Sequence, residues 1–344
     1  MKVVVAIDSF KGSMTSMQAG NACKEGILAA AHAHCGSGAA AAKDRKPAAD
    51  NMKVVVKPLA DGGEGTVEAL VEGMSGTYEY VPVTGPMGNP VKARYGILPD
   101  QTVVMEMAEA SGITLVKEPL NPWKAASTGV GEMILDAVQK GCRKFIIGIG
   151  GSATTEGGIG MLSALGYDFM DENGDILPPV FASLEKVVQI ENNRVPEMLK
   201  DCHFQIACDV TNPLCGVEGC VYVFGAQKGV KEEEKESMDR AMQSYAACME
   251  KFTGKKFSEI PGTGAAGGLG FAFLWGLPNV ELKPGIDIVL EAVGLASELQ
   301  DADIVVTGEG CLDFQTAMGK VPVGVAKAAK QYGCEVIALS LIHI

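Results

Sequence analysis

The stretch 144–161 constrains the fold of this chain most, because it joins three local structures that few architectures can accommodate together. The residues from Phe145 to Ile149 are mostly apolar, which is typical of a buried strand. A glycine-rich loop follows at 150–155, and apolar residues at helical spacing begin at Ile159. We predict a strand, a glycine loop and a helix. Such a loop leaves backbone N–H groups unpaired near a helix N-terminus, where phosphate or carboxylate binds well.

The same loop has a second interpretation, a tight packing turn that needs glycine for close approach. It is not a Walker loop, because Gly-x-x-x-x-Gly-Lys-Ser/Thr is absent, and it meets the dinucleotide fingerprint only in part. From the loop alone, an anion site and a packing turn are equally well supported. The choice depends on whether related chemistry recurs elsewhere in the chain.

Composition narrows the classes of function. A chain of 344 residues predicts about two domains, and its net charge of −13 argues against a nucleic-acid partner. No apolar run approaches the roughly 20 residues that span a bilayer, so we expect no membrane partner. Ten cysteines without a C-x-x-C pair, and only four histidines, disfavour zinc. Scattered cysteines beside apolar runs are typical of reduced thiols, and we expect a cytoplasmic protein.

Strands and helices alternate at both ends of the chain, which is typical of a parallel α/β sheet. We expect strands at 3–7, 54–56, 304–306 and 336–339, and helices at 15–33, 66–71, 286–299 and 323–331. The segment 36–50 is low in complexity and is predicted to be a surface loop.

The middle of the chain differs in kind. Three segments rich in β-branched and aromatic residues, 78–83, 91–97 and 102–107, predict an antiparallel meander. A helix at 128–139, strands at 145–149 and 204–208, a charged helix at 231–252 and a second glycine loop at 262–270 follow. We therefore predict two domains: a flavodoxin- or Rossmann-like parallel sheet from 1–65 and 285–344, and an inserted mixed α/β domain at 66–284.

Acidic residues follow the apolar strands in four places, at Asp8, Asp61, Asp209 and Glu309. In open α/β sheets the ligand crevice lies beyond the carboxyl ends of the strands. Together with the loop at 150–155, these positions predict that polar turns far apart in the sequence converge in one cleft. Taken singly, each aspartate could instead be an N-cap or a turn residue.

These residue types fit phosphoryl transfer, which needs donors around phosphates, carboxylates for a metal ion and a group beside the attacking hydroxyl. Backbone donors could come from Gly150–Thr154 and Gly262–Gly268. Lysines in short loop signatures are Lys11, Lys228 and Lys320, although an ordinary surface lysine is the simpler interpretation of each one alone. Asp209 and Asp313 are the leading candidates for base or metal ligand. Histidine-dependent hydrolysis is disfavoured because no Gly-x-Ser-x-Gly elbow is present.

Six motifs, in order along nearly the whole chain, resemble the bacterial type-1 glycerate kinase family: 7–13, 60–66, 149–154, 207–214, 264–268, and 307–310 with 313–315 and 319–322. The resemblance implies transfer of the γ-phosphoryl group of ATP to D-glycerate with magnesium. It implies the 2-hydroxyl as acceptor, although the residues themselves do not distinguish the 2- from the 3-hydroxyl. It also implies a flavodoxin-like domain with an insert of restriction-endonuclease-like topology.

The motifs give a candidate site, with the roles assigned from residue chemistry. The catalytic candidates are Asp209, Asp313, Lys11 and Glu309, of which Asp209 and Glu309 are also the candidate magnesium ligands. The candidate substrate- and phosphate-binding residues are Asp8, Ser9, Asp61, Gly62, Gly63, Glu64, Gly150, Gly151, Ser152, Thr154, Asn212, Lys228, Gly267, Gly268 and Lys320. Which of them contact ATP and which contact glycerate is left open, and Arg94 is a further candidate for the glycerate carboxylate.

Three alternatives stay open. The chain could be a kinase of another small hydroxy acid, or a sugar-acid sensor that binds without chemistry; a nicotinamide dehydrogenase is the least favoured. A homo-oligomer is compatible with the sequence. The resemblance implies further α/β units after residue 340, so we expect a C-terminally truncated sheet in the terminal domain.

Overall fold

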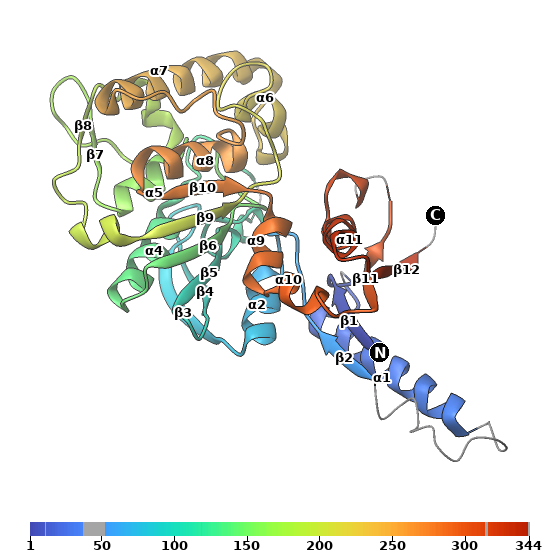
Figure 1. The fold of residues 1–344 in the computed structure, drawn as a ribbon. Coiled ribbons are helices and arrows are strands. Elements are labelled where there is room, and N and C mark those ends of the chain that lie inside the picture. Colours follow the sequence, from blue (N-terminus) through green and yellow to red (C-terminus); the bar gives the residue numbers. More distant parts are fainter. Residues whose placement is uncertain (11, 37–51, 118, 314–315, 343–344) are drawn as a thin grey trace. The chain divides into compact units, whose positions relative to one another are not determined.

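The computed structural model describes residues 1–10, 12–36, 52–117, 119–313 and 316–342 (Figure 1). It consists of two compact units. Unit 1 comprises Met1–Asp61, Gly65–Gly76 and Ile286–Ile344, and unit 2 comprises Gly62–Glu64 and Thr77–Gly285. Residues 66–76, predicted to start the inserted domain, thus make their contacts within unit 1; the predicted domain boundaries otherwise stay a prediction. Lys11 and the predicted loop from residue 37 onward lie outside the described residues.

Unit 1 is a four-stranded parallel sheet built from both ends of the chain, which confirms the predicted fold class. Its strands, in the order β12-β11-β1-β2, are β1 (Lys2–Ile7), β2 (Lys53–Val56), β11 (Ile304–Cys311) and β12 (Glu335–Ile342). Its helices are α1 (Ser16–Gly36), α2 (Thr66–Met74), α9 (Gly285–Ala292), α10 (Leu295–Leu299) and α11 (Val321–Gln331). Figure 1 shows α1 beside β1 and β2, and α11 beside β11 and β12. Alternate residues of β1 form the core with α1: Val3, Val5 and Ile7 pack with Phe10 and Ala19.

Two predictions for unit 1 are wrong in detail. The helix expected at 286–299 is divided into α9 and α10 at Gly294, whose φ of 63° breaks the helical path. The strand expected at 304–306 continues to Cys311, because β12 pairs with it as far as Cys311↔Ile342. Glu309 therefore lies inside β11 and not after it.

Unit 2 contains a six-stranded mixed sheet in the order β10-β9-β6-β5-β4-β3. The pairs β3–β4 and β4–β5 are antiparallel, as the predicted meander requires, and the remaining pairs are parallel. The strands are β3 (Thr77–Thr84), β4 (Pro90–Ile97), β5 (Thr102–Glu106), β6 (Lys144–Gly148), β9 (His203–Ala207) and β10 (Val280–Lys283), with a separate hairpin of β7 (Asp168–Met170) and β8 (Gln189–Glu191).

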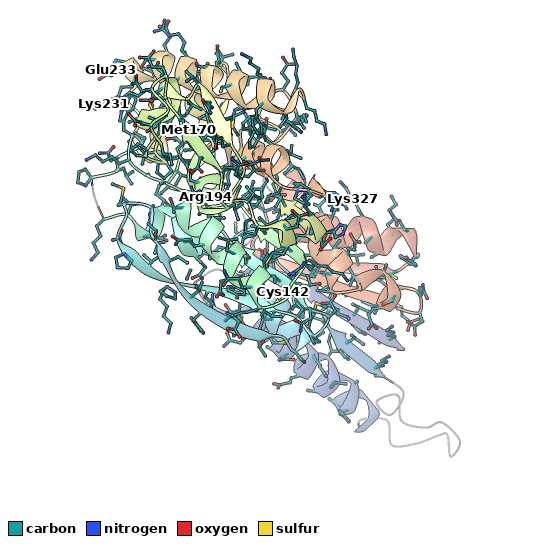
Figure 2. All side chains as sticks on the ribbon, turned by 90° about the vertical axis from the view of Figure 1, so that its left-hand side faces the viewer. Cys142, Met170, Arg194, Lys231, Glu233 and Lys327 are labelled. Atoms are coloured by element: carbon teal, nitrogen blue, oxygen red, sulfur yellow. The ribbon has the colours of Figure 1, made fainter. Side chains whose placement is uncertain are left out.

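One continuous apolar core holds unit 2 together, joining the sheet to its helices. The helices are α3 (Ala108–Ser111), α4 (Thr128–Gln139), α5 (Ile159–Ala164), α6 (Cys220–Phe224), α7 (Lys235–Thr253) and α8 (Ala265–Gly276). Cys142, labelled in Figure 2, is a fully buried member of this core. The charged helix begins later than predicted, at Lys235, after a 3₁₀ turn at Glu232–Glu234. No helix of the described residues is long and apolar enough to cross a membrane.

Candidate active site

The predicted site residues fall into two cavities, one in each unit. The cavity of unit 2 has a volume of about 310 Å³ and lies where β6 and β9 end. Its wall is formed mainly by backbone and apolar side chains, with a few polar groups. The lining residues are Gly62, Gly63, Ile113, Ile149, Gly150, Gly151, Ser152, Ala207, Cys208, Asp209, Val210, Phe224, Gln227, Lys228, Ala265 and Ala266.

Lys228 is the cation of this cavity, and only 3% of it is exposed. It ends a 3₁₀ turn, Ala226–Lys228, after which Gly229 takes a φ of 94°. Its Nζ donates to Ser152 Oγ at 2.6 Å and to the carbonyl oxygen of Thr154 at 2.7 Å. An ammonium group has three donors, and among the described residues Nζ has only these two hydrogen-bond partners. One N–H therefore remains for a ligand in the cavity that Lys228 lines.

Burial changes the ionisation of Lys228. Desolvation lowers the pKa of Lys228 from 10.5 to about 8, while the nearby Cys220 and Glu156 act in the opposite direction. Water solvates an ammonium ion better than a protein interior does, so the charged form of Lys228 is less stable here than in water. An anion bound in the cavity would remove that disadvantage. The geometry and the ionisation both indicate an anion site.

The first glycine loop contributes backbone donors to the cavity. The N–H groups of Gly150 and Gly151 have no hydrogen-bond partner among the described residues, and both residues are exposed. Gly151 has a φ of 71°, which a residue with a side chain rarely adopts. The helix that follows the loop, α5, begins at Ile159 as predicted, after Gly157 and Gly158 turn the chain with positive φ into the core. The donors that this cavity offers an anion are thus the loop amides and Lys228, and the role of a helix N-terminus stays a prediction.

The second glycine loop acts by packing against the first. Ala266, Gly267 and Gly268 are three successive left-handed residues at the start of α8. A Cβ on Gly267 would lie 2.1 Å from the carbonyl oxygen of Thr154, and Gly157 N donates to Gly267 O at 2.9 Å. For Gly267 and Gly268 the structure therefore shows close backbone packing, and Ala266 is the member of this turn that lines the cavity.

Asp209 is the carboxylate of the unit 2 cavity. It follows β9, is exposed, and its Oδ1 accepts a hydrogen bond from Gly285 N at 2.9 Å. Asn212 lies outside the cavity lining, with its side chain donating to the carbonyl oxygen of Glu218 at 2.8 Å. Cys208 also lines the cavity, but its thiol donates to the carbonyl oxygens of Val210 and Gly262, and burial raises the pKa of the Cys208 thiol. It is a packing thiol and not a nucleophile.

The cavity of unit 1 has a volume of about 270 Å³ and lies at the carboxyl ends of the parallel strands. Four carboxylates line it, together with a single lysine. The lining residues are Asp8, Ser9, Asp61, Glu309, Gly310, Cys311, Asp313, Lys320 and Leu341. Asp8 and Glu309 are only 6% and 7% exposed. Glu309 Oε1 accepts from Thr316 Oγ1 at 2.5 Å, and Glu309 Oε2 lies 3.9 Å from Lys320 Nζ.

These carboxylates do not form a ready-made metal cage. Among the described residues no group of three or more His, Cys, Asp or Glu is arranged to hold a metal ion. Magnesium is usually held by one or two carboxylates, with phosphate oxygens and water completing its coordination. The carboxylate-lined cavity fits magnesium of that kind, in complex with a nucleotide, and does not fit a structural metal.

Comparison with known proteins identifies the family. The sequence model of the Glycerate kinase family matches residues 3–341. The chain belongs to the glycerate kinase family. A glycerate kinase of Bacillus subtilis is 43% identical over 342 residues, which cover 99% of this chain and 85% of that protein. The glycerate 2-kinase of Escherichia coli is 41% identical over the same shares. A crystal structure from Salmonella typhimurium LT2, described as a glycerate kinase 2, matches with a TM-score of 0.90 and 40% identity, covering 99% of this chain and 86% of that one.

Family membership does not assign the roles of individual residues, which stay predictions. Of the predicted residues, the unit 2 cavity contains Gly62, Gly63, Gly150, Gly151, Ser152, Asp209 and Lys228, and the unit 1 cavity contains Asp8, Ser9, Asp61, Glu309, Asp313 and Lys320. Neither cavity is lined by Glu64, Thr154, Asn212, Gly267 or Gly268. Arg94 lines neither cavity and lies 3.5 Å from Glu109.

Sequence reasoning missed several residues of the site. Gln227 and the apolar Ile113 and Phe224 line the unit 2 cavity, and Gln227 was adjacent to a predicted lysine. Glu156 lies within the stretch 144–161, but the spacing of apolar residues does not predict that this glutamate is buried.

Proposed function

We propose that this chain transfers the γ-phosphoryl group of ATP to D-glycerate, with the 2-hydroxyl as acceptor. Near-full-length similarity to proteins named glycerate kinase and glycerate 2-kinase supports the reaction. The observation that carries the proposal in the structure is Lys228, a buried cation with a remaining N–H donor in a glycine-framed cavity. An anionic substrate is what such a site selects.

The unit 2 cavity would bind an anionic group of a substrate. Lys228 donates to it from one side, and the backbone N–H groups of Gly150 and Gly151 donate from the glycine loop. Preorganised donors stabilise negative charge as it develops during transfer, because they need no rearrangement at that moment. Asp209 lines the same cavity and would accept a hydrogen bond from a substrate hydroxyl or orient it.

The unit 1 cavity would bind the magnesium complex of the nucleotide. One or two of the carboxylates Asp8, Asp61, Glu309 and Asp313 would hold magnesium, with phosphate oxygens and water as the other ligands. Bound there, magnesium would neutralise negative charge on the phosphates. Lys320, at 3.9 Å from Glu309, would contact a phosphate oxygen. Of the two proposed magnesium ligands, Glu309 lies in this cavity, whereas Asp209 lies in the cavity of unit 2.

The proposal includes a cytoplasmic location and is compatible with a homo-oligomer. The nine cysteines whose side chains the structure describes are free thiols, which agrees with a reducing compartment. The oligomeric state can be measured by light scattering of the purified protein.

The test is ATP consumption with D-glycerate and magnesium, followed by ³¹P NMR of the product. A phosphate on the 2-hydroxyl is coupled to one proton and gives a doublet, whereas a phosphate on the 3-hydroxyl is coupled to two protons. A doublet supports the proposal, and a triplet would assign the 3-hydroxyl. Turnover of lactate, which lacks the 3-hydroxyl, at the rate of glycerate would favour a broader hydroxy acid kinase. Glycerate binding without any phosphate transfer would favour a sensor.

A further inference from the structure

Glu156 is a fully buried glutamate at the end of the first glycine loop. Its Oε1 accepts hydrogen bonds from Ser127 N at 2.9 Å, from Ser127 Oγ and from Gly160 N at 3.3 Å. Ser127 precedes α4, and Gly160 lies in the first turn of α5. The Oε1 atom therefore fastens the end of the loop to two helices, and Ser127 Oγ accepts in turn from Met161 N at 3.0 Å.

This clamp does not by itself require a carboxylate. A glutamine would present the same acceptor oxygen to Ser127 and Gly160 without a buried charge. The second oxygen, Oε2, has no hydrogen-bond partner among the described residues, and a buried carboxylate oxygen in that state is unfavourable. Burial raises the pKa of the Glu156 carboxyl, so a charged Glu156 needs a further interaction that favours the carboxylate.

Lys228 is the cation with which a charged Glu156 would interact favourably. Both acceptors of its Nζ, Ser152 Oγ and the carbonyl oxygen of Thr154, belong to the loop that Glu156 terminates. The titratable groups around Lys228 are Glu156, Cys220 from α6, and Asp209 in the same cavity. Tyr245 from α7 interacts electrostatically with Glu156, and its buried hydroxyl has no partner among the described residues.

The charges of these groups single out Glu156. Burial raises the pKa of the Cys220 thiol to about 12 and raises the pKa of the Tyr245 hydroxyl as well, so both groups are neutral at pH 7. Asp209 is exposed, and water screens its charge. Burial raises the pKa of the Glu156 carboxyl as well, but the hydrogen bonds from Ser127 and Gly160 oppose that effect. The Glu156 carboxylate favours the ammonium form of Lys228. A buried carboxylate and a buried ammonium stabilise each other's charge more strongly than an exposed pair does.

We propose that Glu156 is the positioning residue of the unit 2 cavity: its carboxylate fastens the loop that holds Lys228 and keeps Lys228 in the cationic form that binds an anion. The inference deepens the proposed function and rests on it for the identity of the anion. It does not place Glu156 in contact with a substrate. It assigns the ionisation of the anion-binding lysine to a residue outside the cavity lining.

The test compares Glu156→Gln with the wild type and with Glu132→Gln. Glu132 is a matched control, because it also accepts from the backbone N and the Oγ1 of one residue, Thr84, at 2.6 and 2.9 Å, but it lines neither cavity of the site. The first readout is ¹H–¹⁵N NMR of the lysine side chains, with the Lys228 signal assigned by its loss in Lys228→Met. We expect the titration midpoint of Lys228 to fall by about one pH unit in Glu156→Gln and to stay in place in Glu132→Gln. An unchanged midpoint in Glu156→Gln would overturn the proposal.

The second readout is activity, and it separates this proposal from the proposed function. The rise of KM at alkaline pH should begin about one pH unit lower in Glu156→Gln, whereas a clamp alone would change KM equally at every pH. The NMR titration needs no turnover. If the wild type fails to phosphorylate glycerate while the midpoint still moves, the proposed function fails and the role of Glu156 stands.

A double variant keeps the proposal testable if Glu156→Gln folds poorly. Removing one partner of a buried charge pair leaves the other uncompensated, whereas removing both is far less harmful. We therefore expect the double variant Glu156→Gln/Lys228→Met to melt at a higher temperature than Glu156→Gln alone. Additive losses of stability in this double-mutant cycle would show that the two side chains are independent and would overturn the proposal.

Discussion

The two cavities occupy equivalent places on two different sheets, yet the balance of charged side chains that line them differs. Each lies where parallel strands end. The unit 2 cavity has one buried lysine and one exposed carboxylate, Asp209, in a frame of glycine backbone, and the unit 1 cavity has four carboxylates and one lysine. The position of a site therefore follows from sheet topology, whereas the ligand it selects follows from the side chains that the loops carry.

Burial also differs between the two cavities. Lys228 is 3% exposed, whereas a third of the Lys320 side chain is exposed. Electrostatic interactions weaken as water enters a site, so equal substitutions should have unequal effects. Removing the lysine of the unit 2 cavity should harm the enzyme more than removing that of the unit 1 cavity.

The largest effect is expected for Lys228→Met. Loss of a preorganised, desolvated donor to developing charge lowers kcat/KM by about 10³-fold. The melting temperature should also fall, because the substitution leaves the buried Glu156 without its compensating charge, so the kinetics are measured below the unfolding transition. Steady-state kinetics with glycerate and ATP check this, with Lys320→Met as the matched variant, for which we expect a loss of about tenfold. Equal losses would contradict the contrast in burial.

Gly267→Ala should give the largest change in stability. The new Cβ would lie 2.1 Å from the carbonyl oxygen of Thr154 and 2.6 Å from Thr155 Cα, at a φ of 68°. We expect a loss of about 3 kcal/mol in the free energy of unfolding, from overpacking and backbone strain together. Gly254→Ala separates the two causes, because Gly254 has a φ of 70° and open space around its Cβ position. Strain alone should lower its stability by about 1 kcal/mol, as measured by urea unfolding.

The contrast between the cavities also explains what could be predicted from sequence. Glycine loops, strand ends and acidic turns are local patterns, so they predicted the sheets and most of the lining residues. Gly267 illustrates the limit of local patterns. The sequence predicted it to lie in a glycine loop, but whether it faces a ligand or packs against Thr154 depends on a loop more than 100 residues away in the sequence. The role of Glu156 depends in the same way on Ser127, and the length of β11 depends on its pairing with β12. Hydrophobic periodicity predicts neither of these contacts.

Asp313→Asn tests whether the carboxylates of unit 1 hold magnesium. Asp313 is exposed and lines the cavity with three other carboxylates, so its loss should weaken magnesium binding without unfolding the protein. We expect the magnesium concentration for half-maximal rate to rise by about 30-fold, with the rate restored at high magnesium. Glu172→Gln, at an exposed position outside both cavities, is the control. A loss of rate that magnesium cannot restore would indicate a catalytic base in place of a metal ligand.

The pH dependence of anion binding should identify the unit 2 cavity, because the pKa of its lysine, Lys228, is about 8. Anion affinity should be complete below pH 8 and fall about tenfold for each pH unit above it, as the ammonium form is lost.

The effect on stability has the opposite sign. Because the folded pKa lies below the ordinary 10.5, the unfolded chain binds more protons between pH 8 and 10.5, and Lys228 favours folding increasingly as pH rises through that range. Unfolding of wild type and Lys228→Met across this range measures the difference, and parallel curves would contradict the depressed pKa.

The smallest effect should come from Ala266→Gly, which tests whether the frame of the unit 2 cavity is strained. Among the described residues that line either cavity, Ala266 alone combines a side chain with a positive φ, 52°. Glycine would relieve a left-handed strain of about 1 kcal/mol, but it also gives the unfolded chain more freedom, so we expect a net stabilisation of about 0.5 kcal/mol. Its neighbour Ala265 has no positive φ and begins α8, where glycine should destabilise by about 1 kcal/mol. Urea unfolding of the two variants should therefore give opposite signs, and equal signs would mean that the turn holds no strain at Ala266.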